Sequence, residues 1–388
     1  MTTYKRLPVA FESGEGSWLI DDKGERYLDA LSGISVCNIG HSNPKITATI
    51  SQQAGRLMHT SNLYEVPLQQ ELATRLCDLS GLDSIFFCNS GAEANEAAIK
   101  LCRKFAYQKN VKNPVIVVMQ GSFHGRTMAT LSATGNEKVH EGFAPLLQGF
   151  HHIAYNDLAA LNQLSSLDME IVAIMLEPVQ GEGGVVVPSQ GYLQAVRKIC
   201  DANDWLMVLD EIQTGMCRTG HWFAWQHENV RPDIMTLAKS LGNGMPIGAC
   251  LANTKSAEAM GPGSHGSTFG GNPLAACTAL AVIEYMTENQ LANQSTRMGA
   301  EMLANFQSEL VHLNGVKDIR GKGLMLGIEL DRPCAELVTQ ALHKHLLINV
   351  TADKVIRLLP PLTMNEKEMK MIVEKVCELV KNFLRESA

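Results

Sequence analysis

The stretch WLMVLDEIQTG, residues 205–215, joins a short apolar run directly to a polar turn. Its apolar part, WLMVLD (205–210), ends at a carboxylate, and a second run, DIMTLAK (233–239), ends at a lysine. Short apolar runs bounded by polar turns are typical of buried strands. The stretch therefore predicts two strands of a buried sheet, each ending in a titratable side chain.

The same alternation continues on both sides of this stretch. Further strands are expected in SIFFC (84–88), PVIVVMQ (114–120), IVAIML (171–176) and PIGACLA (246–252), and helices in AEANEAAIKLCRKFAYQ (92–108) and YLQAVRKICDAN (192–203). Alternating strands and helices predict an α/β fold with a mostly parallel sheet covered on both faces. Ligands of such sheets bind at the carboxyl ends of the strands, where polar clusters follow nearly every run.

The pattern changes near residue 272. A long helical run (273–290) follows, then Gly321-Lys322-Gly323 before the apolar run LMLGIEL (324–330), and last an amphipathic helix (366–385). We expect an N-terminal segment (1–50), a large domain (51–271) and a smaller C-terminal α+β domain (272–388).

The composition and charge of the chain limit the kinds of molecule that it is expected to bind. The chain has 388 residues, 45% of them hydrophobic, and a net charge of -7, which argues against nucleic acid or an anionic membrane as the main partner. We find no apolar run of the roughly 20 residues that span a bilayer, and no secretory signal at the start. Ten cysteines without a C-x-x-C pair suggest buried thiols in a reducing compartment, so a cytoplasmic location is expected.

Four motifs carry candidate chemistry. Asn89 to Glu96 places Ser90 at a helix start, which suits an anion but also fits an ordinary N-cap. Asp210, at a strand end, could pair with a protonated ring nitrogen, but it could equally be the N-cap of a helix or part of an acidic pair that binds a metal. In TLAKSLGNG, Lys239 suits a Schiff-base amine, although most lysines are solvated. In GSFHGRT, Phe123 could stack on a flat ring and Arg126 could bind a carboxylate.

Taken together, these motifs are those of a known family. NSGAEANEAAIKLCR, GSFHGRT, EPVQGEGG, LDEIQTGMCRTG, LAKSLGNGMPIGA and STFGGNP resemble the class III aminotransferases of the fold-type I enzymes that use pyridoxal phosphate (PLP), from about Val9 to about Glu374. The resemblance implies a large mostly parallel-sheet domain, a smaller α+β domain and a homodimer with shared active sites.

It also implies a role for each matching residue. Lys239 corresponds to the Schiff-base lysine that shuttles the substrate proton, and Asp210 to the partner of the ring nitrogen. Gln213 corresponds to the residue near the ring hydroxyl, and Phe123 to the stacking aromatic. The phosphate cradle corresponds to Ser90, Gly91 and Ala92, with Thr268 reaching the phosphate of the neighbouring subunit. Ser267 is expected among the substrate-binding residues.

Within the family the sequence is most similar to the N-acetylornithine aminotransferases. SNLYEVP (61–67), SFHGRT and RLLPPL (357–362) carry this similarity. It implies that Arg126 binds the α-carboxylate of N-acetylornithine, that Arg357 binds that of 2-oxoglutarate, and that Glu182 masks Arg357 while an ω-amino donor is bound. Ile34 stands where ornithine aminotransferases typically carry tyrosine, which favours an acylated donor. Succinylornithine, N-succinyl-diaminopimelate, 4-aminobutyrate and ornithine remain alternatives.

Other functions have weaker support. A nicotinamide dehydrogenase would need G-x-G-x-x-G between a strand and a helix, which we do not find, since Gly242-Asn243-Gly244 has the wrong spacing to a third glycine. A serine hydrolase would need G-x-S-x-G, which is also absent. A glutamate-1-semialdehyde aminomutase would share the scaffold but need no 2-oxoglutarate. No metal site is expected: His343-Lys344-His345 is assigned to a solvated helix and His151-His152 to a loop.

Overall fold

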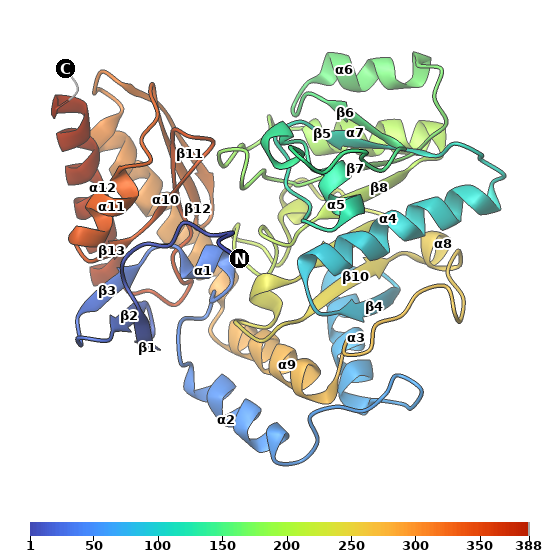
Figure 1. Cartoon of the computed structure of the whole chain (residues 1–388), viewed down its shortest axis with the longest axis horizontal. Helices are drawn as coiled ribbons and strands as arrows, with labels where there is room; N and C mark the ends of the chain where they lie inside the picture. Colours follow the sequence, from blue (N-terminus) through green and yellow to red (C-terminus); the bar gives the residue numbers. More distant parts are fainter. Residues whose placement is uncertain (387–388) are drawn as a thin grey trace.

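The largest element of the computed structural model, which describes residues 1–386, is a sheet of seven strands (Figure 1). Its strand order is β4-β10-β9-β8-β7-β5-β6. The strands are β4 (Ser84–Cys88), β5 (Val115–Met119), β6 (Phe150–Ile153), β7 (Ile171–Leu176), β8 (Leu206–Asp210), β9 (Ile234–Leu237) and β10 (Gly248–Ala252). β10 runs antiparallel to both of its neighbours, β4 and β9, and all other pairs in this sheet are parallel, so the predicted mostly parallel α/β fold is confirmed.

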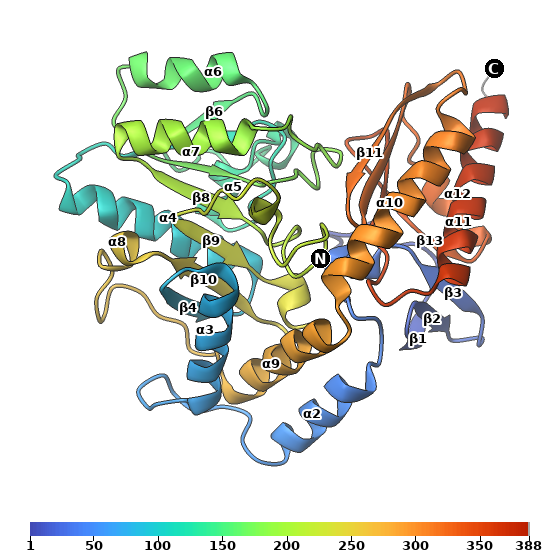
Figure 2. The ribbon, with the colours of Figure 1, turned by 180° about the vertical axis from the view of Figure 1, so that it is seen from behind.

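Helices cover both faces of this sheet. The covering helices are α4 (Gly91–Gln108), α5 (Met128–Ala133), α6 (Leu158–Gln163), α7 (Tyr192–Asn203) and α8 (Thr254–Ala257). In β8, Val208 packs in the same cluster as Ala97 of α4, whereas Leu209 packs with Val196 of α7. Side chains alternate across a strand, so continuous apolar runs are what a sheet buried on both faces requires. Figures 1 and 2 show α4 and α7 on opposite sides.

A second body combines both ends of the chain. It contains two sheets of four strands each. The first, in the order β1-β2-β3-β13, consists of β1 (Phe11–Glu15), β2 (Trp18–Asp21), β3 (Arg26–Asp29) and β13 (Leu346–Leu347). The second, in the order β11-β12-β15-β14, consists of β11 (Val316–Lys322), β12 (Met325–Leu330), β15 (Val355–Leu358) and β14 (Asn349–Thr351). The helices of this body are α10 (Leu291–Leu310), α11 (Leu337–His343) and α12 (Glu366–Glu386). Because β3 pairs in parallel with β13, the N-terminal strands lie beside the C-terminal elements, as Figure 2 shows.

The long helix α9 (Pro273–Glu288) lies below the large sheet, against α2 (Pro44–Ala54) and α3 (Pro67–Ser80). The domain boundaries at residues 50 and 271 stay predictions. No helix among residues 1–386 is both long and apolar enough to cross a membrane.

Two expectations about histidine pairs were wrong. His151 and His152 lie in the edge strand β6, where they pair with Val117 and Val118 of β5, and not in a loop. The predicted solvated helix around His343 ends at that residue, and His345 adopts a φ of 54° beyond it and stacks on Tyr27.

Candidate active site

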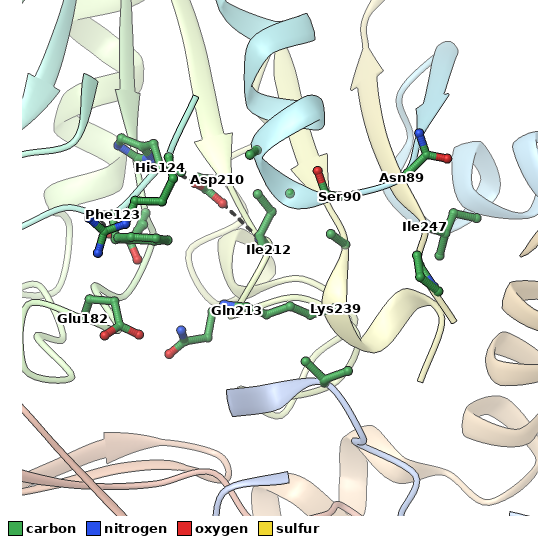
Figure 3. Close-up of a pocket in the computed structure, with 18 of the residues that line it drawn as sticks. Asn89, Ser90, Phe123, His124, Glu182, Asp210, Ile212, Gln213, Lys239 and Ile247 are labelled. Atoms are coloured by element: carbon green, nitrogen blue, oxygen red, sulfur yellow. Dashed lines mark hydrogen bonds and ion pairs between the residues drawn. The ribbon is translucent and has the colours of Figure 1, made fainter. Parts of the chain in front are cut away.

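A cavity of about 370 Å³ opens at the carboxyl ends of β8 and β9, beside the start of α4 (Figure 3). Nine of the twelve residues proposed from sequence line it. They are Ser90, Gly91, Ala92, Phe123, Arg126, Glu182, Asp210, Gln213 and Lys239. The volume is in the range of small-molecule sites, and the position is where parallel sheets bind ligands.

Asp210 is the last residue of β8 and is 3% exposed. Its Oδ2 accepts hydrogen bonds from Asn95 Nδ2 at 2.7 Å and pairs with His124 Nδ1 at 2.8 Å, while Oδ1 accepts the Ile212 N–H at 3.1 Å. A buried carboxylate held on three sides keeps one orientation, and lone pairs remain to receive a cation from the cavity.

Lys239 follows β9 but lies outside it, contrary to the predicted strand 233–239. Its φ is 46°, and it begins the 3-10 turn Lys239–Leu241, which aims the side chain at the cavity. Burial lowers the pKa of the Lys239 amine, Glu182 raises it and Arg357 lowers it further. Within residues 1–386 no hydrogen bond or ion pair occupies this amine, so it is available as a nucleophile.

The start of α4 forms the opposite wall. Ser90 is its N-cap, and the Ser90 Oγ accepts the Glu93 N–H at 3.2 Å, so the ordinary capping interpretation also applies. The first N–H groups of the helix have no acceptor within it and favour an anion. A Cβ at Gly91 would lie 2.8 Å from Ile212 Cδ1, so only glycine permits this approach of helix and loop.

Phe123 and Arg126 come from the loop after β5. The Arg126 guanidinium lies 5.4 Å from the Phe123 ring centroid, and its side chain is exposed. Behind them, the buried Glu177 accepts the N–H of Phe123 on Oε2 at 3.0 Å and that of Gly181 on Oε1 at 3.2 Å. One carboxylate thus holds both the aromatic loop and the loop that carries Glu182.

Glu182 and Arg357, which sequence spacing could not place together, are in direct contact. Arg357 Nη1 lies 2.6 Å from Glu182 Oε1 and 3.3 Å from Gln213 Oε1, and Nη2 is buried without a partner in the described chain. Burial raises the pKa of Glu182, but the charge and hydrogen bond of Arg357, together with Lys239 and Gln213, outweigh this effect, so the pKa is lowered. A Cβ at Gly181 would lie 2.1 Å from Gln213 Oε1, so this glycine makes room for Gln213.

Ser267 and Thr268 do not line this cavity. They lie in a neighbouring surface cavity, where Ser267 Oγ accepts hydrogen bonds from Asn89 Nδ2 at 3.2 Å and the Gly270 N–H at 3.0 Å. Their roles remain predictions, since that of Thr268 requires a second subunit.

Three residues around the site were not assigned from sequence. Asn95 and His124 hold Asp210, and Glu177 holds the two loops. All three stand in the quoted polar clusters after strands, and that position was the available signal. The contacts of Asn95 and His124 with Asp210, and of Glu177 with Phe123, join residues 54 to 115 positions apart, which no local pattern shows.

The residues present fit the expected cofactor. PLP carries an aldehyde, a ring nitrogen that can bind a proton and a phosphate. The unpaired Lys239 amine, the buried Asp210 carboxylate and the start of α4 match these groups within one cavity.

Comparison with known proteins agrees with this arrangement. The sequence model of the class III aminotransferases matches residues 2–380. An acetylornithine aminotransferase of Nitrosomonas europaea is 54% identical over 99% of this chain and 98% of its own length. The structure resembles an ornithine aminotransferase of Toxoplasma gondii, whose structure shows partial occupancy of PLP at the active site (TM-score 0.94, 32% identity, 98% and 93% of the two chains). It also resembles an acetylornithine aminotransferase of Elizabethkingia anophelis (TM-score 0.87, 34% identity, 98% and 96%). The chain therefore belongs to the class III aminotransferases and is a PLP-dependent enzyme.

Proposed function

We propose that this protein transfers the δ-amino group of N-acetylornithine to 2-oxoglutarate, giving N-acetylglutamate semialdehyde and glutamate, a step of arginine biosynthesis. The ion pair between Glu182 and Arg357 is the observation that carries the proposal. An enzyme that accepts a terminal amine in one half-reaction and an α-carboxylate in the other needs an arginine whose charge can be masked and released.

Two arginines suit the two substrates. Arg126 lies at the exposed edge of the cavity, where it can bind the α-carboxylate of the donor. Arg357 is buried, and its Nη2 keeps a free donor for the carboxylate of 2-oxoglutarate. When 2-oxoglutarate binds, Glu182 must turn away and leave Arg357 to the incoming carboxylate.

The chemistry requires a proton to leave the amine-bearing carbon. PLP, when bound, withdraws electrons from that carbon. In our proposal Asp210 would keep the ring nitrogen protonated, Lys239 would hold the cofactor covalently and carry the proton, and Phe123 would stack on the ring. Gln213 would serve the ring hydroxyl, and the start of α4 would hold the phosphate through Ser90, Gly91 and Ala92.

Ile34 supports an acylated donor over free ornithine. Its apolar side chain packs in a small cluster with Leu31, Val187 and Leu359, and it offers no hydroxyl to an α-amino group. Overall shape does not separate the two activities, because ornithine and acetylornithine enzymes both match the structure well. Sequence identity favours the acetylornithine group.

We also propose a homodimer with shared active sites, in which Thr268 reaches the phosphate of the second subunit and Ser267 lies near its substrate. Beside them, large apolar side chains are exposed without cover: Leu57 at 50%, Met58 at 56%, Leu63 at 88%, Tyr64 at 69% and Phe269 at 60%. Contiguous exposed apolar side chains mark association surfaces. Light scattering at several concentrations tests the dimer.

A cytoplasmic location is proposed as well. All ten cysteines are unpaired, and seven are buried. Free buried thiols are typical of proteins of reducing compartments.

The first experiment is a visible spectrum of the purified protein before and after N-acetylornithine is added without 2-oxoglutarate. We expect the absorbance of the aldehyde form of the cofactor to convert to that of the amine form. Conversion by ornithine, N-succinyl-diaminopimelate, succinylornithine or 4-aminobutyrate, with none by N-acetylornithine, would assign another ω-aminotransferase.

A further inference from the structure

Among the described residues, Arg218 and Arg357 are the two largest side chains that are buried without any exposure. Arg218 stands in the loop after β8, behind the active site. All five of its N–H groups are donated to neutral oxygens. Nε donates to Ser35 Oγ at 3.0 Å, Nη1 to the Leu324 and Pro360 carbonyls at 2.9 and 2.7 Å, and Nη2 to Ser32 Oγ at 3.3 Å and to Asn38 Oδ1.

No carboxylate among residues 1–386 forms an ion pair with Arg218. Burial lowers the pKa of the guanidinium, and the charge of Asp29 opposes this. A buried charge without a counter-ion is destabilising unless its hydrogen bonds are complete. A lysine offers three donors in place of five and lacks the planar fork, so it cannot replace this set.

The acceptors come from three parts of the chain. Ser32, Ser35 and Asn38 belong to the N-terminal segment, Leu324 to the turn before β12 and Pro360 to the segment after β15. The backbone of Ser32–Ser35 (α1) is left-handed, with φ of 47°, 66° and 60° at Ser32, Ile34 and Ser35. Such residues are strained and persist only where the surroundings hold them.

Two hydrogen-bond paths lead from Arg218 to the site. Ser35 Oγ donates to the Gln213 carbonyl at 3.2 Å, and Ser32 Oγ donates to the Leu359 carbonyl at 2.7 Å. Leu359 and Pro360 directly follow the strand that carries Arg357. Gln213 and the segment after Arg357 are therefore both connected by hydrogen bonds to one guanidinium. The side chains of Gln213 and Arg357 are also in contact, since Arg357 Nη1 lies 3.3 Å from Gln213 Oε1.

We infer that Arg218 is a positioning residue for carboxylate recognition: through Ser35 and Ser32 it fixes Gln213 and Arg357 relative to each other. This role rests on the proposed function, in which Arg357 receives the α-carboxylate of 2-oxoglutarate. Arg218 itself does not line the cavity.

The test uses the holoenzyme and glutarate, a dicarboxylate that lacks the keto group. Isothermal titration calorimetry measures the glutarate Kd of wild type, Arg218→Lys, Ser35→Ala and the control Ser80→Ala. Ser80 is also buried, but its Oγ donates to the Leu76 carbonyl of its own helix. The spectral conversion by N-acetylornithine and the midpoint of thermal unfolding are measured in parallel.

We expect Arg218→Lys to weaken glutarate binding about tenfold and Ser35→Ala about threefold, as when one buried hydrogen bond is lost. Ser80→Ala should bind as wild type does, and donor conversion should change less than glutarate binding. If Arg218→Lys does not fold, the glutarate Kd of Ser35→Ala alone tests the inference. Folded Ser35→Ala protein with a wild-type Kd would overturn the inference.

Absence of glutarate binding by the wild type would overturn it too, because Arg357 would then receive no carboxylate. Failure of the proposed function is seen separately, in the donor spectrum of the wild type.

Discussion

Arg357 and Glu182 form an ion pair of 2.6 Å between residues 175 positions apart in the chain. The two side chains of the pair differ in solvent exposure. The Arg357 side chain is 0% exposed, whereas that of Glu182 is 34% exposed. Glu182 can therefore turn toward solvent while Arg357 stays in place, so the acid is the moving part of the pair.

Replacing Glu182 by alanine should change which amino donor is preferred. Arg357 would be left without its partner and would attract an α-carboxylate near the cofactor. We expect the ratio of kcat/KM for N-acetylornithine to that for glutamate to fall at least about tenfold, equivalent to ~1.4 kcal/mol. Steady-state kinetics with each donor measures this ratio.

Glu182→Gln is the matched variant, since it keeps the size of the side chain and removes the charge. It should shift the ratio in the same direction. An unchanged ratio in both variants would show that Glu182 does not mask Arg357.

Much of the fold was predictable from local pattern. IVAIML (171–176) and YLQAVRKICDAN (192–203) coincide with β7 and α7. Both are long enough, and their pattern strong enough, to determine the local structure without help from distant residues. β1 (Phe11–Glu15) was not predicted, because most of its residues are exposed and its sheet includes β13 from the other end of the chain.

The site was predictable in its parts but not in its contacts. Family motifs indicated Lys239 and Asp210, and the structure brings both to one cavity. Long-range polar contacts were not foreseeable. Nothing local distinguishes Arg218 from a solvated arginine, yet its acceptors lie 106 to 186 residues away. Such contacts depend on tertiary packing, which sequence periodicity does not encode.

Replacing Lys239 by alanine should abolish transamination, because no other amine lines the cavity among the described residues. Cofactor binding should persist through Asp210 and the start of α4, but without a covalent bond. We expect turnover to fall at least about 10⁴-fold. Spectra after borohydride treatment measure covalent attachment. Lys112→Ala, at an exposed lysine, is the control; substantial turnover by Lys239→Ala would refute the role.

Glu177 should make stability depend on pH. Burial raises the pKa of its carboxyl to about 7, although His124 lowers it. The folded protein then binds a proton that the unfolded chain releases near pH 4.5. Stability is therefore expected to fall as the pH rises from about 4.5 through about 7, by up to ~3 kcal/mol.

Glu177→Gln removes this titration, so its unfolding midpoint should decline less than that of wild type between pH 5 and 8. Glu211, whose pKa burial also raises to about 7, is present in both proteins and cancels in the difference. Parallel pH profiles would mean that Glu177 stays ionised in the folded protein.

Arg126 and Arg357 are expected to serve different substrates, and Arg126→Ala tests this division. Arg126 is exposed at the mouth of the cavity, while Arg357 lies buried behind it. Loss of the Arg126 guanidinium should raise the KM for N-acetylornithine about thirtyfold, equivalent to ~2 kcal/mol, because the donor carboxylate loses its paired charge. The KM for 2-oxoglutarate should change less than threefold, roughly a single weak hydrogen bond. Equal increases for both substrates would contradict the division, since one arginine would then serve both carboxylates.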